Sequence, residues 1–199
     1  MKTWLIIGLL LCSSSLHALS QESMEVKQSR SPDGKYRFQI SSVSEDRSLS
    51  AVELISAKNG QPVGEPLVVG YGYYPSTADP EVLKILWAPD SKTVAVMTRG
   101  TKHTCQVQLY LLTEKGLQPI PLAPAITVAA QKELGSTENT RSIWEKPAQW
   151  LDSDRIIIRA TGSTQLAGKP VQYEVDVTCS VSKKSVISAK KVSIGPVKN

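Results

Sequence analysis

The stretch Ser31-Pro32-Asp33-Gly34-Lys35-Tyr36 recurs twice, in altered form, further along the chain. The second copy is Trp87-Ala88-Pro89-Asp90-Ser91-Lys92, and the third is Trp150-Leu151-Asp152-Ser153-Asp154-Arg155. Each copy precedes an apolar run that is typical of a β-strand, at 36–40, 94–97 and 156–158. A turn that recurs before a strand indicates a repeated β unit, and such a repeat decides the fold.

The middle copy shows the unit most clearly, with strands predicted at 82–87, 93–97, 106–112 and 117–122. Pro89 and Asp90 favour a turn, because proline presets φ and aspartate hydrogen-bonds the backbone two residues on. The run 106–112 alternates apolar and polar residues, as a half-buried strand does. Pro119 and Pro121 place the fourth strand at a sheet edge, because proline donates no ladder hydrogen bond.

The outer copies divide in the same way. The first unit has predicted strands at 24–28, 36–40, 51–55 and 66–69, with an Asn59-Gly60 hairpin turn. The third has strands at 148–151, 155–158, 171–177 and 185–188. We therefore expect an all-β, propeller-like array of three four-stranded antiparallel meanders, spanning about 24–70, 81–122 and 144–195. One short helix is expected near 124–134, ending at Gly135.

The segment Trp87-Ala88-Pro89-Asp90-Ser91-Lys92-Thr93-Val94-Ala95-Val96 resembles the W-S-P-D-G-K-x-I-A-F unit of TolB-like bacterial β-propellers. The first copy matches the turn but has Arg30 in place of the tryptophan, and the third keeps Trp150 but lacks the proline. The resemblance covers three turn-and-strand segments. It implies an exported or periplasmic platform for protein binding.

Three units are fewer than the four to eight blades of closed propellers. The copies lie 57 (89 − 32) and 63 (150 − 87) positions apart, whereas the commonest propeller repeats have about 40–45 residues. The extra residues fall in the connections 70–80 and 123–146. The units could form an open arc, a compact pinwheel or a distorted barrel, or they could close by self-association. The helix near 124–134 could cover the gap.

The first twenty residues have the pattern of a signal peptide, with Lys2, the apolar run 4–11 and the cleavage-type end Ala18-Leu19-Ser20. We expect cleavage after Ser20, export to the periplasm or the outside, and a single domain at 21–199. Lipid attachment at Cys12 is the less favoured alternative, because Leu11 precedes it. No later segment is apolar enough over about 20 residues to span a membrane.

Charge and reactive residues point away from several functions. The net charge of +5 is mild, and its basic residues look scattered, with doublets only at 183–184 and 190–191. Nucleic-acid binding, which needs a basic face with stacking aromatics, is therefore not expected. Asp152-Ser153-Asp154 is interpreted as a β-turn, not as the start of a calcium loop. We expect no metal and no cofactor.

Two cysteines remain after the predicted cleavage, Cys105 and Cys179. An exported protein could bridge them, and the sequence leaves this open because it does not give their separation. His103 lies two residues before Cys105, and the alternative function is a small envelope enzyme that uses His103 with Cys105 or with an acid. A structural role for both residues is the favoured interpretation.

The best binding candidates are tyrosines in the connection Gly70-Tyr71-Gly72-Tyr73-Tyr74-Pro75, together with Trp144 in the second long connection. Tyrosine and tryptophan suit exposed contact surfaces, although such rings also fold back on a core. Trp87 and Trp150 recur at matching positions and are predicted to be packing residues. We expect a non-catalytic binding or scaffolding module that contacts a protein partner through loops 70–80 and 123–146. A self-associating structural protein is a further alternative.

Overall fold

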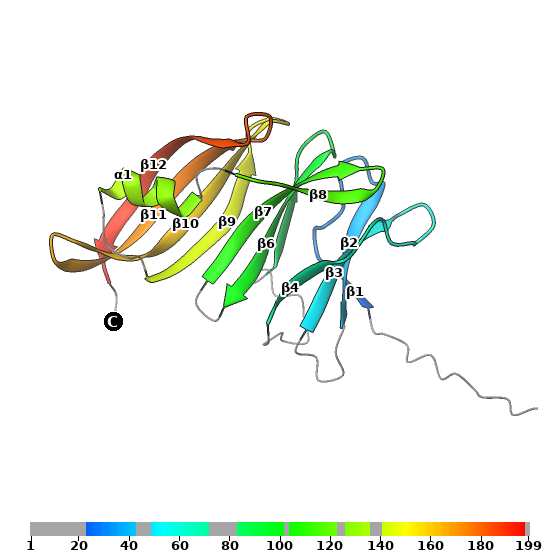
Figure 1. Cartoon of the computed structure of the whole chain (residues 1–199), viewed down its shortest axis with the longest axis horizontal. Helices are drawn as coiled ribbons and strands as arrows, with labels where there is room; N and C mark the ends of the chain where they lie inside the picture. The colour runs from blue at the N-terminus through cyan, green and yellow to red at the C-terminus, as the bar shows by residue number, and fades with distance from the viewer. Residues whose placement is uncertain are drawn as a thin grey trace, which may run out of the picture.

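The computed structural model describes residues 23–42, 49–71, 83–101, 104–122, 126–135 and 141–197. These residues form mostly β-strands and one short helix, as predicted, in a four-stranded and an eight-stranded sheet (Figure 1). Both sheets are open: the described strands end in edges and do not close into a ring. Within these ranges, no helix has the length and apolarity to cross a membrane. The predicted signal peptide lies outside the described residues.

The first unit is the four-stranded sheet, in which neighbouring strands pair antiparallel in chain order. Its strands are β1 (Ser23–Glu25), β2 (Tyr36–Ser42), β3 (Leu49–Ser56) and β4 (Leu67–Tyr71). The second unit pairs in the same way, through β5 (Lys84–Trp87), β6 (Thr93–Thr101), β7 (Thr104–Thr113) and β8 (Gly116–Ile120). Among the described strands, β8 pairs with β7 alone, consistent with the edge position that Pro119 predicts.

The third unit has the longest strands, which again pair antiparallel in order. They are β9 (Arg141–Trp150), β10 (Arg155–Leu166), β11 (Lys169–Ser180) and β12 (Ser185–Pro196). Helix α1 (Ile126–Leu134) precedes them and lies across β10, β11 and β12 (Figure 1). One parallel bridge, between Cys105 on β7 and Trp144 on β9, joins the second and third units into the eight-stranded sheet.

Two tryptophans link successive units through equivalent hydrogen bonds. The indole Nε1 of Trp87 donates to the carbonyl of Ser29 at 2.9 Å, and that of Trp150 donates to the carbonyl of Leu86 at 3.0 Å. Each acceptor lies one residue before the position in the preceding unit that matches the tryptophan. Both rings are buried, as predicted for packing residues. The repeat is therefore a repeat of contacts as well as of sequence.

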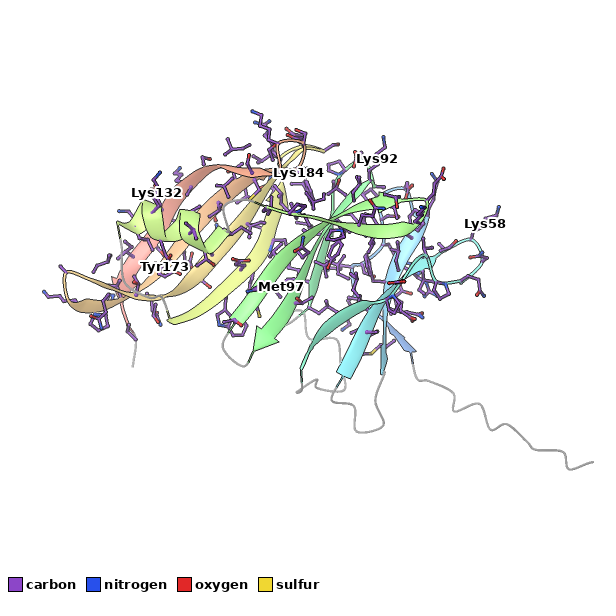
Figure 2. All side chains as sticks on the ribbon, viewed as in Figure 1. Lys58, Lys92, Met97, Lys132, Tyr173 and Lys184 are labelled. Carbon is purple, nitrogen blue, oxygen red and sulfur yellow. The ribbon has the colours of Figure 1, made fainter. Side chains whose placement is uncertain are left out.

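The middle unit is apolar on both faces. Alternate residues of β6 point to opposite sides, so Val94 and Val96 join one core with the first unit, and Ala95 and Met97 join a second core. The second core contains residues of β7, of α1 and of the inner face of the third unit, Tyr173 among them (Figure 2). Unit two is thus held between two hydrophobic cores.

The outer face of each end unit carries a paired arginine and carboxylate. On the first unit, Arg37 alternates with the buried Phe38 and pairs with Glu25 at 2.6 Å. On the third unit, Arg159 lies between buried Ile158 and Ala160 and makes two hydrogen bonds to Asp176, at 2.8 and 3.0 Å. A further unit packed against either face would have to bury these charges.

Candidate binding site at the end of the third unit

The tyrosine candidates fall mostly outside the part of the chain that the structure describes. Tyr73 and Tyr74 lie in residues 72–82, which are not described. His103 lies in residues 102–103, which are not described either. The backbone of Tyr71 ends β4, opposite Leu49, and its side chain is not described. Most of loop 70–80 is likewise outside. The expectation that 123–146 is a connection throughout is wrong, because Arg141–Trp150 forms strand β9 and places Trp144 on a strand. Trp144 is the binding candidate whose surroundings can be examined.

Trp144 borders a hollow of about 650 Å³ at one end of the third unit. Main-chain pairing places it in one row with Thr161 on β10, Glu174 on β11 and Ser193 on β12. All four residues line the hollow. Gly195 lines it as well, and a Cβ atom there would meet nothing within 4 Å. The hollow is therefore a mixed surface, with a half-buried indole beside hydroxyl and carboxylate groups.

The open edge of β12 adjoins this hollow through Ser193, Ile194 and Gly195. β12 is the outermost strand of the eight-stranded sheet and has a partner strand on one side only among the described residues. Its pairing with β11 skips one residue at Ile187 and another at Val192, which marks two β-bulges. These two side chains are 48% and 45% exposed. Bulges redirect side chains and interrupt an edge ladder.

Basic charge is concentrated in the segment that contains this last strand and the turn before it. Residues 181–199 contain five lysines and no acidic residue, and the whole chain has a net charge of +5, so the rest of the chain is neutral. The expectation of scattered basic charge is therefore wrong for this segment. The signal was present in the sequence, but the two lysine doublets were not assigned to one strand. Lys184 projects from the β11–β12 turn in Figure 2.

Glu145 holds the junction between the second and third units. This residue is 6% exposed, and its Oε2 accepts the main-chain N–H of Val107 on β7 at 3.1 Å. Its Oε1 accepts the hydroxyl of Thr127 on α1 at 3.0 Å. Burial raises the pKa of the Glu145 carboxyl, although these hydrogen bonds oppose the shift. The carboxylate thus fixes α1 and β9 to β7. Sequence reasoning did not identify it.

Cys105 and Cys179 are both fully buried thiols in the structure, without a disulfide between them. Burial, together with the charge of Glu145, raises the pKa of Cys179 to about 12. A thiol with this pKa stays protonated at neutral pH and is a poor nucleophile.

Asp152 and Asp154 act on the main chain of two turns, as the β-turn interpretation predicts. Asp152 Oδ1 accepts the N–H groups of Asp154 and Arg155, at 2.9 and 2.8 Å. Asp154 accepts the N–H of Ser182 and the hydroxyl of Ser180, at 2.7 and 2.8 Å. The described residues contain no group of three or more His, Cys, Asp or Glu side chains that could hold a metal ion.

No family model matches the chain, and no curated protein matches it in sequence.

Proposed function

We propose that this protein is an exported, non-catalytic binding module that contacts a partner protein with the end of its third unit. The observation that carries the proposal is the hollow of about 650 Å³ beside Trp144, which continues onto the open edge of β12. This volume lies within the range of about 300–1,000 Å³ that is typical of ligand-binding pockets. An indole ring combines apolar area with a polar tip, which suits a contact surface.

The scaffold supports this role. The hollow is built on four paired strands, and strands hold side chains more precisely than loops do. α1 and Glu145 brace the same unit from its inner face. A rigid, pre-formed surface loses little entropy on binding, which favours affinity.

We also propose that the three units are divergent blades of the TolB-like type. The equivalent tryptophan-to-carbonyl bonds of Trp87 and Trp150 support this relationship. The two open sheets are compatible with an open arc of such blades. Platforms of this kind offer their exposed surfaces to partner proteins.

The test is affinity capture from extracts of the native cell envelope, with the mature chain as bait. Trp144→Ala should remove the specific partner, whereas Leu111→Ala, at a 41% exposed position on β7, should retain it. Tyr73→Ala, tested in parallel, reports on loop 70–80. If the Trp144 variant retains the partner and the Tyr73 variant loses it, the contact lies in loop 70–80 and not at the end of the third unit. A bait that captures no specific protein would contradict the proposal.

A further inference from the structure

The last strand carries a charge pattern that the rest of the molecule lacks. Lys183 and Lys184 lie in the turn before β12, and Lys190 and Lys191 lie within it. No ion pair involves these four lysines in the described part of the chain. Asp176 lies opposite Lys190 on β11 but pairs with Arg159.

Exposed apolar side chains lie between and after the two lysine doublets. Ile187, Val192 and Ile194 are 48%, 45% and 39% exposed, and the first two occupy the bulges. The bulges direct these residues away from the regular ladder. The edge thus presents aliphatic side chains and ammonium groups together.

A carboxylate already binds this strand within the protein. Oε1 of Glu133 on α1 accepts the main-chain N–H of Lys191 at 3.3 Å. An edge strand offers such N–H groups to a partner as well as its side chains. The contact shows that a carboxylate can bind a main-chain N–H of this strand, and it occupies that N–H of Lys191.

We propose that β12 binds an acidic, extended segment of a partner protein. Carboxylates of the segment face the lysines, and its apolar side chains contact Ile187, Val192 and Ile194, with the hollow beyond Ile194 receiving one of them. Main-chain pairing is confined to the stretches between the bulges. This inference rests on the proposed protein-binding function and names the chemistry of the partner.

A second copy of this chain is disfavoured at the same edge in the register that opposes the two lysine doublets. Antiparallel pairing of two β12 strands about their lysine doublets would place like charges opposite one another. Directly opposed like charges destabilise a strand pair. Charge complementarity therefore selects an acidic segment of a different protein.

The experiment measures binding of two synthetic ten-residue peptides with capped ends, one alternating glutamate and valine and the other lysine and valine. Fluorescence anisotropy with the full mature chain should show binding of the acidic peptide only, weakened by added salt. Lys190→Glu/Lys191→Glu should weaken that binding by about tenfold or more and should favour the lysine peptide. Lys27→Glu/Lys58→Glu, exposed positions of the first unit with the same charge change, should alter it by about twofold at most.

Equal weakening in both double variants would overturn the inference, because it would show a general charge effect. Binding of phosphatidylglycerol vesicles that needs Lys190 and Lys191, without binding of the acidic peptide, would also overturn it in favour of a lipid surface. Loss of the envelope partner in Trp144→Ala but not in Lys190→Glu/Lys191→Glu would support the proposed binding function and contradict the proposed role of the β12 edge. Binding of the acidic peptide, without capture of any envelope protein, would support the acidic-segment site on β12 and contradict the proposed function.

Discussion

Gly64 and Gly116 touch through their backbones. A Cβ atom on Gly64 would lie 2.8 Å from the Cα of Gly116, and one on Gly116 would lie 2.7 Å from the Cα of Gly64. Both residues also have positive φ, at 78° and 104°. The first belongs to the β3–β4 connection and the second begins β8, so this contact brings the tip of the first unit onto the second.

We therefore expect Gly64→Ala to destabilise the fold by more than about 2 kcal/mol, because it combines a left-handed backbone with a backbone clash. Gly60→Ala is the matched control. Gly60 has a similar φ of 69°, but a Cβ there meets nothing within 4 Å. This control should cost only about 1 kcal/mol. Urea unfolding of the two variants measures the difference, and equal losses would contradict the role of the contact.

The tryptophan bonds between units can be tested by removing only their donor. Trp150→Phe keeps an aromatic ring but loses the hydrogen bond to the carbonyl of Leu86, and its side chain is smaller. We expect a loss of about 2 kcal/mol, from the hydrogen bond and the cavity together. Trp87→Phe should cost a similar amount, because its bond to Ser29 is equivalent. Thermal and denaturant unfolding check both values. A large loss in only one variant would argue against a repeated link.

Glu145 predicts a pH dependence with a definite sign. Burial raises the pKa of its carboxyl in the folded protein, so the folded state holds this proton more tightly than the unfolded state. The contribution of Glu145 to the free energy of unfolding therefore falls as pH rises from the ordinary value of 4.5 through the raised one. In Glu145→Gln this contribution is absent. The amide can still accept from Val107 and donate to the hydroxyl of Thr127.

The measurement is the difference in unfolding free energy between Glu145→Gln and the native sequence, from pH 4 to pH 8. We expect it to shift in favour of the variant as pH rises. A constant difference would show that Glu145 has an ordinary pKa. Glu145→Ala leaves the buried N–H of Val107 without this acceptor and should cost about 1–3 kcal/mol at every pH.

The two buried cysteines should be unreactive in the native protein. Both side chains are fully buried, and the pKa of Cys179 is raised to about 12. We expect a thiol reagent such as Ellman's reagent to label neither residue on the time scale of minutes at pH 8, and both after unfolding in denaturant. Rapid labelling of Cys105 in the native protein would instead support the small-enzyme alternative with His103.

Local sequence signals located most elements because their causes are local. Asp33 and Asp90 each accept a main-chain N–H two residues on, at 3.1 and 3.0 Å, and these turn bonds come directly from the recurring motif. The helix before Gly135 was predicted at 124–134 and is observed at Ile126–Leu134. Gly135 follows it with a φ of 67°, the left-handed conformation that glycine often adopts after the last residue of a helix.

The third unit was predicted too short because its outer face is polar. β10 was expected at 155–158 but extends to Leu166, since Arg159, Thr161 and Ser163 alternate with residues of the inner face. The two bulges of β12 further hide its alternation. The junction at Glu145 depends on partners 38 and 18 positions away, which no local pattern encodes. The hollow likewise arises from four strands brought into register.

The charged pairs on the outer faces determine how an array of this kind could lengthen. A unit joined to either end would meet the Arg37–Glu25 pair or the Arg159–Asp176 pair, and would have to bury charges to stack there. A unit inserted next to the middle one would find apolar surfaces on both sides. Longer descendants of this chain should therefore arise by internal duplication of the segment around Trp87, with both present ends retained.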